Sequence, residues 1–101
     1  MKLGLAEDEV MGDVGKPIVV SVHAEQRMRQ RGATTLEVEM AVRETRWVPA
    51  QRGKWSAARR FTYNAVSPVN GKTYAYKKVE TVFAEEATAI VVVTVKVYYH
   101  D

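Results

Sequence analysis

The sequence predicts an α+β fold in which two N-terminal helices pack on an antiparallel meander sheet of three to four strands. Apolar residues repeat with the period of a helix up to about residue 45, and with a period of two from about residue 57 onward. The stretch Thr88–Tyr99 (T-A-I-V-V-V-T-V-K-V-Y-Y) is the most β-prone part of the chain. A chain of 101 residues is long enough for one domain with one core. We place this domain at residues 17–101, after an acidic N-terminal extension at residues 1–16.

The first helix is predicted at residues 21–31 by signals at both of its ends. Ser21 is a good N-cap because its hydroxyl can accept a hydrogen bond from a free backbone N–H of the first turn. Gly32 follows the last good helix former and suits the left-handed conformation that ends many helices. Ala24 and Met28 lie about one turn apart, so we expect this side of the helix to enter the core.

A second helix is predicted at residues 35–45, and a short strand precedes the first helix. Thr34 and Glu37 have the T-x-x-E spacing of a capping box, which opens a helix. The apolar side of this helix consists of Leu36, Met40 and Ala41, broadened by Val38 and Val42. Pro17–Val20 is a short apolar run, and the proline at its start favours an edge strand.

The sheet is predicted from three main strands at residues 57–65, 73–84 and 88–99. Asn70-Gly71, between the first two strands, is a strong hairpin signal. Alternation divides the side chains of the last strand between two faces. The face expected to meet the helices carries Val91, Val93, Val95 and Val97. The other face, which becomes more polar toward its end, carries Ile90, Val92, Thr94, Lys96 and Tyr98. We therefore expect this strand to be central in the sheet.

Charge is unevenly distributed along the chain, although the formal net charge is only +3. Residues 1–13 carry four acidic side chains and one lysine, whereas residues 43–60 carry six basic side chains and one glutamate. Part of the basic stretch lies in Trp47–Ser56, where a proline, a glycine and two tryptophans predict a loop. A basic stretch of this kind can attract phosphate groups, or it can be a solvated surface loop. The sequence leaves both interpretations open.

Composition excludes several kinds of site and location. The chain has no cysteine, which rules out disulfides and thiolate metal sites. Its two histidines are His23 and His100, so we predict no zinc site and no other cofactor. No apolar run approaches the roughly 20 residues of a membrane-spanning helix, and we expect no signal peptide. These features predict a cytoplasmic protein of the bacterial type that has no membrane partner.

The first helix carries a recognisable pattern, S-x-H-A-x-x-R-M-x-x-R-G, in the stretch S-V-H-A-E-Q-R-M-R-Q-R-G. With the T-x-x-E helix and the strands that end in V-V-T-V, the chain resembles the bacterial family called domain of unknown function 4258 over residues 21–99. That family looks related to the RelE-like toxin fold, in which two helices pack on an antiparallel sheet and many members cleave RNA. The resemblance implies a RelE-like fold, a metal-independent ribonuclease or toxin-like activity, and a cognate antitoxin-like partner. The acidic extension lies outside the pattern.

Three side chains of the first helix are candidates for catalysis. His23, Arg27 and Arg31 lie about one turn apart and form one stripe along the helix. Cleavage of RNA without a metal needs an acid, a base and positive charge beside the phosphate oxygens. Histidine titrates near neutral pH, and arginine presents a fork that matches phosphate. The stripe therefore has the residue types that this reaction needs.

Basic and aromatic residues of the loop and the strands are candidates for RNA binding. Cations neutralise phosphates, and aromatic rings stack on bases. The candidates are Trp47, Arg52, Lys54, Trp55, Arg59, Arg60, Tyr63 and Lys78. Tyr76 is an alternative to Tyr63 as a stacking residue or proton donor.

These residues also have other interpretations. His23 can pack and hydrogen-bond locally, Arg27 and Arg31 can form structural ion pairs, and tyrosine and tryptophan are often core residues. We predict a RelE-like ribonuclease or toxin-like domain. The alternative is a non-catalytic RNA- or protein-binding module that uses the same basic face, and a structural protein is a third interpretation. The enzyme interpretation requires His23 and Arg27 to open onto a cleft beside the sheet.

Overall fold

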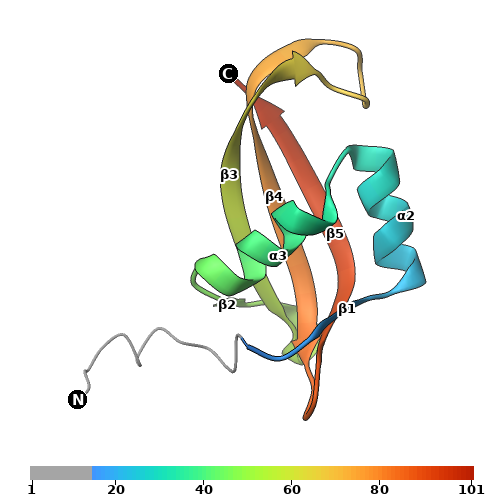
Figure 1. Ribbon diagram of the computed structural model, residues 1–101, viewed down its shortest axis with the longest axis vertical. Helices are drawn as coiled ribbons and strands as arrows, with labels where there is room; N and C mark the ends of the chain where they lie inside the picture. Colours follow the sequence, from blue (N-terminus) through green and yellow to red (C-terminus); the bar gives the residue numbers. More distant parts are fainter. Residues whose placement is uncertain (1–14) are drawn as a thin grey trace, which may run out of the picture.

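Two helices pack on one face of a five-stranded mixed sheet (Figure 1). The structure, a computed structural model, describes residues 15–101. Its elements in chain order are β1 (Ile18–Val20), α2 (Val22–Arg31), α3 (Thr35–Glu44), β2 (Val48–Pro49), the 3₁₀ turn η1 (Gln51–Gly53), β3 (Trp55–Val66), β4 (Thr73–Glu85) and β5 (Ile90–His100). The predicted α+β class, with two helices before the main strands, is confirmed. The predicted acidic extension lies outside the described residues, apart from Gly15 and Lys16.

The strands follow the order β1-β5-β4-β3-β2 across the sheet. β3, β4 and β5 form the predicted antiparallel meander, and β1 pairs in parallel with the start of β5 at the predicted edge. The predicted number of strands is wrong, because Val48–Pro49 in the predicted loop pairs with β3 as a short fifth strand. The central strand is β4 rather than β5, since β5 has an outer neighbour only at residues 90–92.

Both helices begin, and α2 also ends, for the predicted local reasons. The Ser21 hydroxyl accepts a hydrogen bond of 3.1 Å from the backbone N–H of Ala24 at the start of α2. Gly32 ends α2 in the left-handed region at φ 85°, and a Cβ added there would lie 2.4 Å from the Tyr99 hydroxyl. Only glycine satisfies both conditions without strain. The predicted capping box of α3 is also confirmed.

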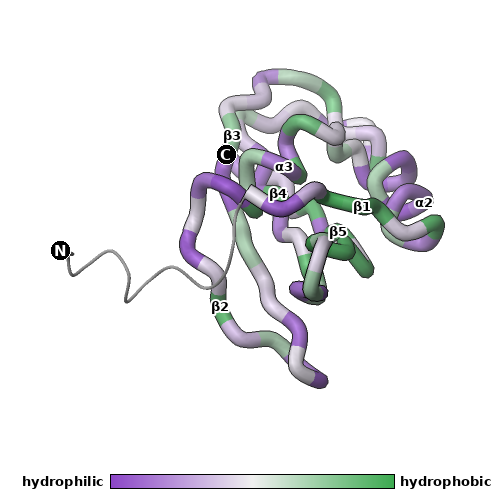
Figure 2. The backbone as a smooth tube through the Cα atoms, turned by 60° about the horizontal axis from the view of Figure 1, so that its bottom comes forward, coloured by the Kyte–Doolittle hydropathy of each residue, from purple (hydrophilic) through white to green (hydrophobic). Residues whose placement is uncertain are grey.

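The two helices bury their apolar sides against the same face of the sheet. α2 packs on β5, and α3 packs on β4 and β3. The core consists of Ala24, Met28, Val38, Val42, Trp47, Ala57, Val79, Phe83, Ile90, Val92 and Val95. In Figure 2, β1 is one of the most hydrophobic segments, and its residues Ile18 and Val20 pack against this core. Leu36 was predicted on the apolar side of α3, but it is exposed at the first turn.

A β-bulge changes which side chains of β5 meet the helices. The pairing with β4 skips Val93, which is the extra residue of the bulge. Because strand side chains alternate, the two faces of β5 exchange at this point. Ile90 and Val92 are therefore buried before the bulge, and Val95 is buried after it. The predicted orientation is confirmed after the bulge but wrong before it, at Val91 and Val93.

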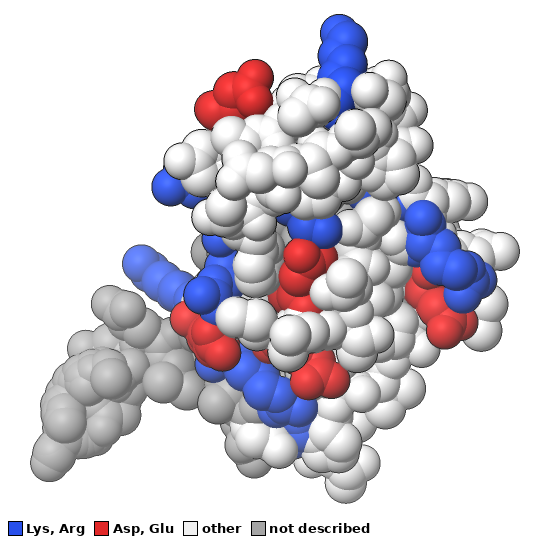
Figure 3. All heavy atoms as spheres, turned by 45° about the horizontal axis from the view of Figure 1, so that its top comes forward, with Lys and Arg blue, Asp and Glu red and all other residues white. Residues whose placement is uncertain are grey.

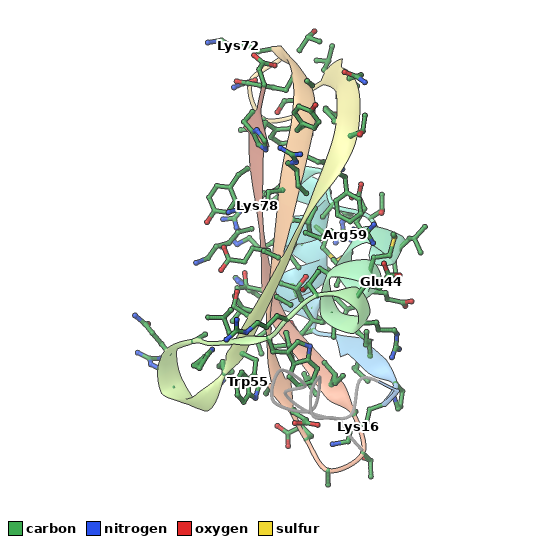
Figure 4. All side chains as sticks on the ribbon, turned by 90° about the vertical axis from the view of Figure 1, so that its left-hand side faces the viewer. Lys16, Glu44, Trp55, Arg59, Lys72 and Lys78 are labelled. Carbon is green, nitrogen blue, oxygen red and sulfur yellow. The ribbon has the colours of Figure 1, made fainter. Side chains whose placement is uncertain are left out.

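No helix within residues 15–101 combines the length and the hydropathy needed to cross a bilayer. The face of the sheet opposite α2 and α3 carries no α-helix from the described part of the chain (Figures 1 and 4). We call it the open face. It is formed by every second residue of β3 and β4 and of the end of β5, including Arg60, Lys78 and Lys96.

Candidate nucleic-acid interface

The stripe predicted for catalysis contributes mainly to structure. The guanidinium of Arg31 donates a hydrogen bond of 2.9 Å to the backbone carbonyl of Val95 and so ties α2 to β5. Arg27 donates one of 2.8 Å to the side chain of Gln30 on the same helix. His23 is exposed and has no hydrogen bond or ion pair with any residue in the described part of the chain. His23 is therefore the stripe residue with the fewest structural constraints.

The stripe does not come together with the basic residues of the open face. α2 lies on the helix-bearing face of the sheet, whereas Arg60 projects from the open face, where it stacks on Tyr76. The sheet itself separates the two groups. Within the described residues, His23 and Arg27 therefore share no cleft with Arg60.

The two tryptophans are not free stacking surfaces at the edge of the site. Trp47 is 2% exposed, and its indole N–H donates to the carbonyl of Val42 at 2.8 Å. Its ring contacts that of Phe83 edge-on at a centroid distance of 4.7 Å. Trp55 is half-buried, with its ring 6.0 Å from that of Trp47. Trp47 is thus a core residue, and the prediction that it stacks on nucleotides is wrong.

Arg59 and Tyr63 also lie on the helix-bearing side. Arg59 forms an ion pair with Glu44 at the end of α3, and Figure 4 shows this pair on the opposite side of the sheet from Lys78. The hydroxyl of Tyr63 donates to the carbonyl of Val66. These partners explain both residues structurally and separate them from the cations of the open face.

A stacked row of three side chains crosses the open face. The guanidinium carbon of Arg60 on β3 lies 4.5 Å from the centroid of the Tyr76 ring on β4. That ring stacks on the imidazole of His100 on β5, with centroids 5.5 Å apart and planes tilted by 24°. The row therefore combines a cation, an aromatic ring and an imidazole on three adjacent strands.

A second pair lies directly beside this row. Lys78 and Tyr98 face each other across β4 and β5, and the ammonium of Lys78 lies 5.2 Å from the centroid of the Tyr98 ring. Tyr98 is 46% exposed, which is unusual for a large aromatic side chain and leaves its ring accessible. The next pair along the strands is Glu80 and Lys96. Together these residues extend the surface toward the β2–η1 turn.

The described cations of the open face form no salt bridges, whereas cations of the helix-bearing side are paired with carboxylates. Arg60, Lys78 and Lys96 form no salt bridge with any residue in the range 15–101, and one carboxylate, that of Glu80, lies among them. On the helix-bearing side, cations pair with carboxylates, as in the ion pairs of Arg29 with Glu25, Arg59 with Glu44 and Lys77 with Glu37. Figure 3 shows this mixture of blue and red atoms on the helix-bearing side. The open face is therefore the electrostatically favourable place for an anion.

Two more predicted cations lie close to this surface. Arg52 and Lys54 belong to the β2–η1 turn and line a groove of about 680 Å³ together with Lys96 of the open face. Of the eight predicted RNA-binding residues, the structure thus brings four to the same side of the sheet. They are Arg52, Lys54, Arg60 and Lys78.

Three residues of the open face were missing from the predicted site. They are Lys96, Tyr98 and His100, all on β5. The alternating pattern did assign Lys96 and Tyr98 to the face that turns away from the helices, and His100 continues the same alternation. This pattern was the available signal, since it places two further rings and a cation on the face that carries Tyr76 and Lys78 of β4.

On the helix-bearing side, the hydroxyl of Tyr99 has a shifted pKa. Burial raises the pKa of the Tyr99 hydroxyl above its ordinary value of 10.0, and the nearby Tyr63 and Glu37 raise it further. This hydroxyl donates a hydrogen bond of 2.6 Å to the carbonyl of Arg31 at the end of α2. Among residues 15–101, no group of three or more His, Cys, Asp or Glu side chains is placed to hold a metal ion.

Comparison of the chain with known protein families, with curated proteins and with solved structures gives no match. The resemblance of the α2 pattern to domain of unknown function 4258 therefore stays a prediction. The geometry of the open face is the basis for a functional proposal.

Proposed function

We propose that this protein binds single-stranded RNA on the open face of its sheet. The observation that carries the proposal is the row of Arg60, Tyr76 and His100 beside the pair of Lys78 and Tyr98. Rings and cations alternate on this surface, which suits the alternation of bases and phosphates in a nucleic acid. The same face has no α-helix from the described residues above it, so a strand of RNA can lie across it.

The chemistry of this face favours a single strand over a duplex. Exposed aromatic rings on a sheet stack on bases that are not already stacked in a helix. Each cation that contacts a phosphate releases counterions and makes the affinity depend on salt. Arg60, Lys78 and Lys96 are available for this role because no carboxylate in residues 15–101 is ion-paired with them.

The proposal is tested by fluorescence anisotropy with a short labelled single-stranded RNA. We expect the wild type to bind, and Tyr98→Ala to bind about 5- to 100-fold more weakly because a stacking ring is lost. Tyr98→Phe keeps the ring and is the matched control, with an affinity close to that of the wild type. A wild type that binds no single-stranded RNA, or a Tyr98→Ala variant that binds as well as the wild type, would contradict the proposal.

Metal-independent cleavage of RNA is a second candidate function, favoured by the position of His100. Its imidazole stacks on Tyr76, and the guanidinium of Arg60 also lies over the Tyr76 ring. An imidazole can transfer protons near neutral pH, and a guanidinium can stabilise charge on the phosphate. The RelE-like fold and the antitoxin-like partner implied by the resemblance belong to this second proposal.

Incubation of purified protein with total RNA separates the two functions. If His100 is the sole general acid or base, His100→Ala should slow cleavage by roughly 10²–10⁴-fold, which is more than it weakens RNA binding. The same loss in His23→Ala instead would support the stripe on α2. RNA binding without cleavage by the wild type leaves the protein as a binding module.

A further inference from the structure

The groove beside the open face is bounded by a turn that backbone hydrogen bonds hold in position. β2 pairs with the start of β3, so the turn that follows is held above the sheet. Two backbone hydrogen bonds close this turn, from Ala50 to the carbonyl of Lys54 at 2.9 Å and from Lys54 to the carbonyl of Gln51 at 3.1 Å. The buried Trp47 anchors the chain directly before β2. Figure 4 shows the turn on the same side of the sheet as Lys78.

The lining of the groove combines apolar walls with one acid and several cations. Val48 and Pro49 of β2 and Val82 of β4 line the groove, and they give a flat ring apolar surface to contact. The volume of about 680 Å³ lies within the range of pockets that hold small organic molecules. The cations that line it are Arg52, Lys54 and Lys96.

Glu80 is held in a defined position on the floor of this groove. Its Oε2 accepts a hydrogen bond of 2.8 Å from the hydroxyl of Ser56 on the adjacent strand. Its Oε1 accepts a longer one, of 3.4 Å, from the hydroxyl of Tyr98. A carboxylate oxygen has two lone-pair sites, so both oxygens keep the capacity to accept another hydrogen bond. The contact with Tyr98 also links the groove directly to the aromatic surface of the open face.

We propose that this groove holds one base of the bound RNA and selects guanine. This inference rests on the proposed RNA binding and adds a base preference to it. Guanine is the base whose Watson–Crick edge presents two adjacent donors, N1–H and the N2 amino group, which match the two oxygens of a carboxylate. In adenine and cytosine the amino group lies beside a ring nitrogen acceptor, and in uracil the N3–H lies between two carbonyls. Those acceptors would face the negative charge of Glu80.

Three cations are placed to contact the phosphates on both sides of the bound base. With the base on Glu80, the phosphates on either side of it can contact Arg52 and Lys54 in the turn and Lys96 on the sheet. The neighbouring base then lies near Tyr98, whose hydroxyl already contacts Glu80. The groove and the open face thus form one continuous path for a single strand.

The test compares short oligouridines that carry one central guanosine, adenosine, cytidine or uridine. We expect the wild type to bind the guanosine-containing strand roughly tenfold more tightly than the other three. Glu80→Gln replaces one acceptor by a donor and should abolish this preference, while the affinity for pure oligouridine stays the same or rises because a negative charge is lost. Glu86→Gln makes the same chemical change in the exposed turn before β5 and should leave the preference intact.

The possible outcomes distinguish a failure of the guanine preference from a failure of the proposed RNA binding. If the wild type binds none of the oligonucleotides, the proposed RNA binding fails and the base preference fails with it. If the wild type binds all four equally, RNA binding stands and the guanine preference is overturned. A preference for guanosine that survives in Glu80→Gln would overturn the role of Glu80. Unchanged thermal unfolding of Glu80→Gln would show that any effect is local.

Discussion

Replacing the buried lysine of β4 should loosen the attachment of both helices to the sheet. The side chain of Lys77 is 5% exposed, and its ammonium lies 2.9 Å from Glu37 on α3 and 2.6 Å from the carbonyl of Gly32 at the end of α2. The ring of Tyr63 covers it at 5.1 Å. One cation therefore connects the central strand to both helices. Lys77→Met keeps most of the volume of the side chain and removes only the charge and its hydrogen bonds.

The expected loss in the free energy of unfolding follows from the carboxylate of Glu37, which Lys77→Met leaves without its charged partner. Removing one partner of a buried ion pair typically costs about 3–5 kcal/mol, because the other charge stays buried without compensation. The side chain of Glu37 is 18% exposed and can gain some hydration, so we expect a smaller loss, about 2–4 kcal/mol. Glu37→Gln keeps an oxygen for the capping bond to the N–H of Thr34 and should cost about 1–2 kcal/mol.

Urea unfolding followed by circular dichroism measures these free energies. The double variant should be more stable than the sum of the single losses predicts, by about 1 kcal/mol or more, since the two residues interact directly. A Lys77→Met variant within about 0.5 kcal/mol of the wild type would refute the reasoning. Strict additivity of the two substitutions would refute it as well.

Three further predictions concern the core and the end of α2. Gly32→Ala should lower the free energy of unfolding by about 2–4 kcal/mol in urea melts, because a Cβ at φ 85° would also meet the Tyr99 hydroxyl at 2.4 Å. Val95→Ala should lower the free energy of unfolding by about 1–3 kcal/mol, and Val93→Ala by clearly less, because only the Val95 side chain is buried. Equal urea midpoints for the two variants would contradict the position of the bulge. The native state holds the Tyr99 proton more tightly than the unfolded state, so stability should fall as pH rises past about 10, and this fall should be shallower in Tyr99→Phe.

Features set by local sequence were predictable. The N-cap at Ser21, the capping box at Thr34 and the glycine at the end of α2 each depend on a few neighbouring residues, and the structure contains all three. The change of period from helix to strand likewise predicted the main meander. A helix end must satisfy its free backbone groups with nearby residues, and a half-buried strand alternates apolar and polar side chains, so both leave a signal in the local sequence.

Features that depend on distant pairing were not predictable in the same way. The bulge at Val93 arises from the register between β4 and β5, and it exchanges the faces of one half of the strand. The burial of Trp47 depends on where the chain returns to the sheet after α3. Alternation along β3 places the adjacent Arg59 and Arg60 on opposite faces, but which face the helices cover, and the pairing of Arg59 with Glu44, depend on how α3 packs on the sheet. Composition therefore predicted a basic surface. Which residues form this surface depends on how the side chains of β3, β4 and β5 alternate between the two faces of the sheet.

The most direct test of RNA binding on the open face is the salt dependence of RNA affinity. We expect the affinity of the wild type for single-stranded RNA to fall as salt rises, with a log–log slope of about −0.7 for each phosphate that a cation neutralises. Lys78→Ala should weaken binding and make this slope shallower by about 0.7. Arg29→Ala removes an equal charge from the helix-bearing side and should leave the slope unchanged. Equal slopes for the Lys78→Ala variant and the wild type, or an affinity that does not respond to salt, would contradict binding on the open face.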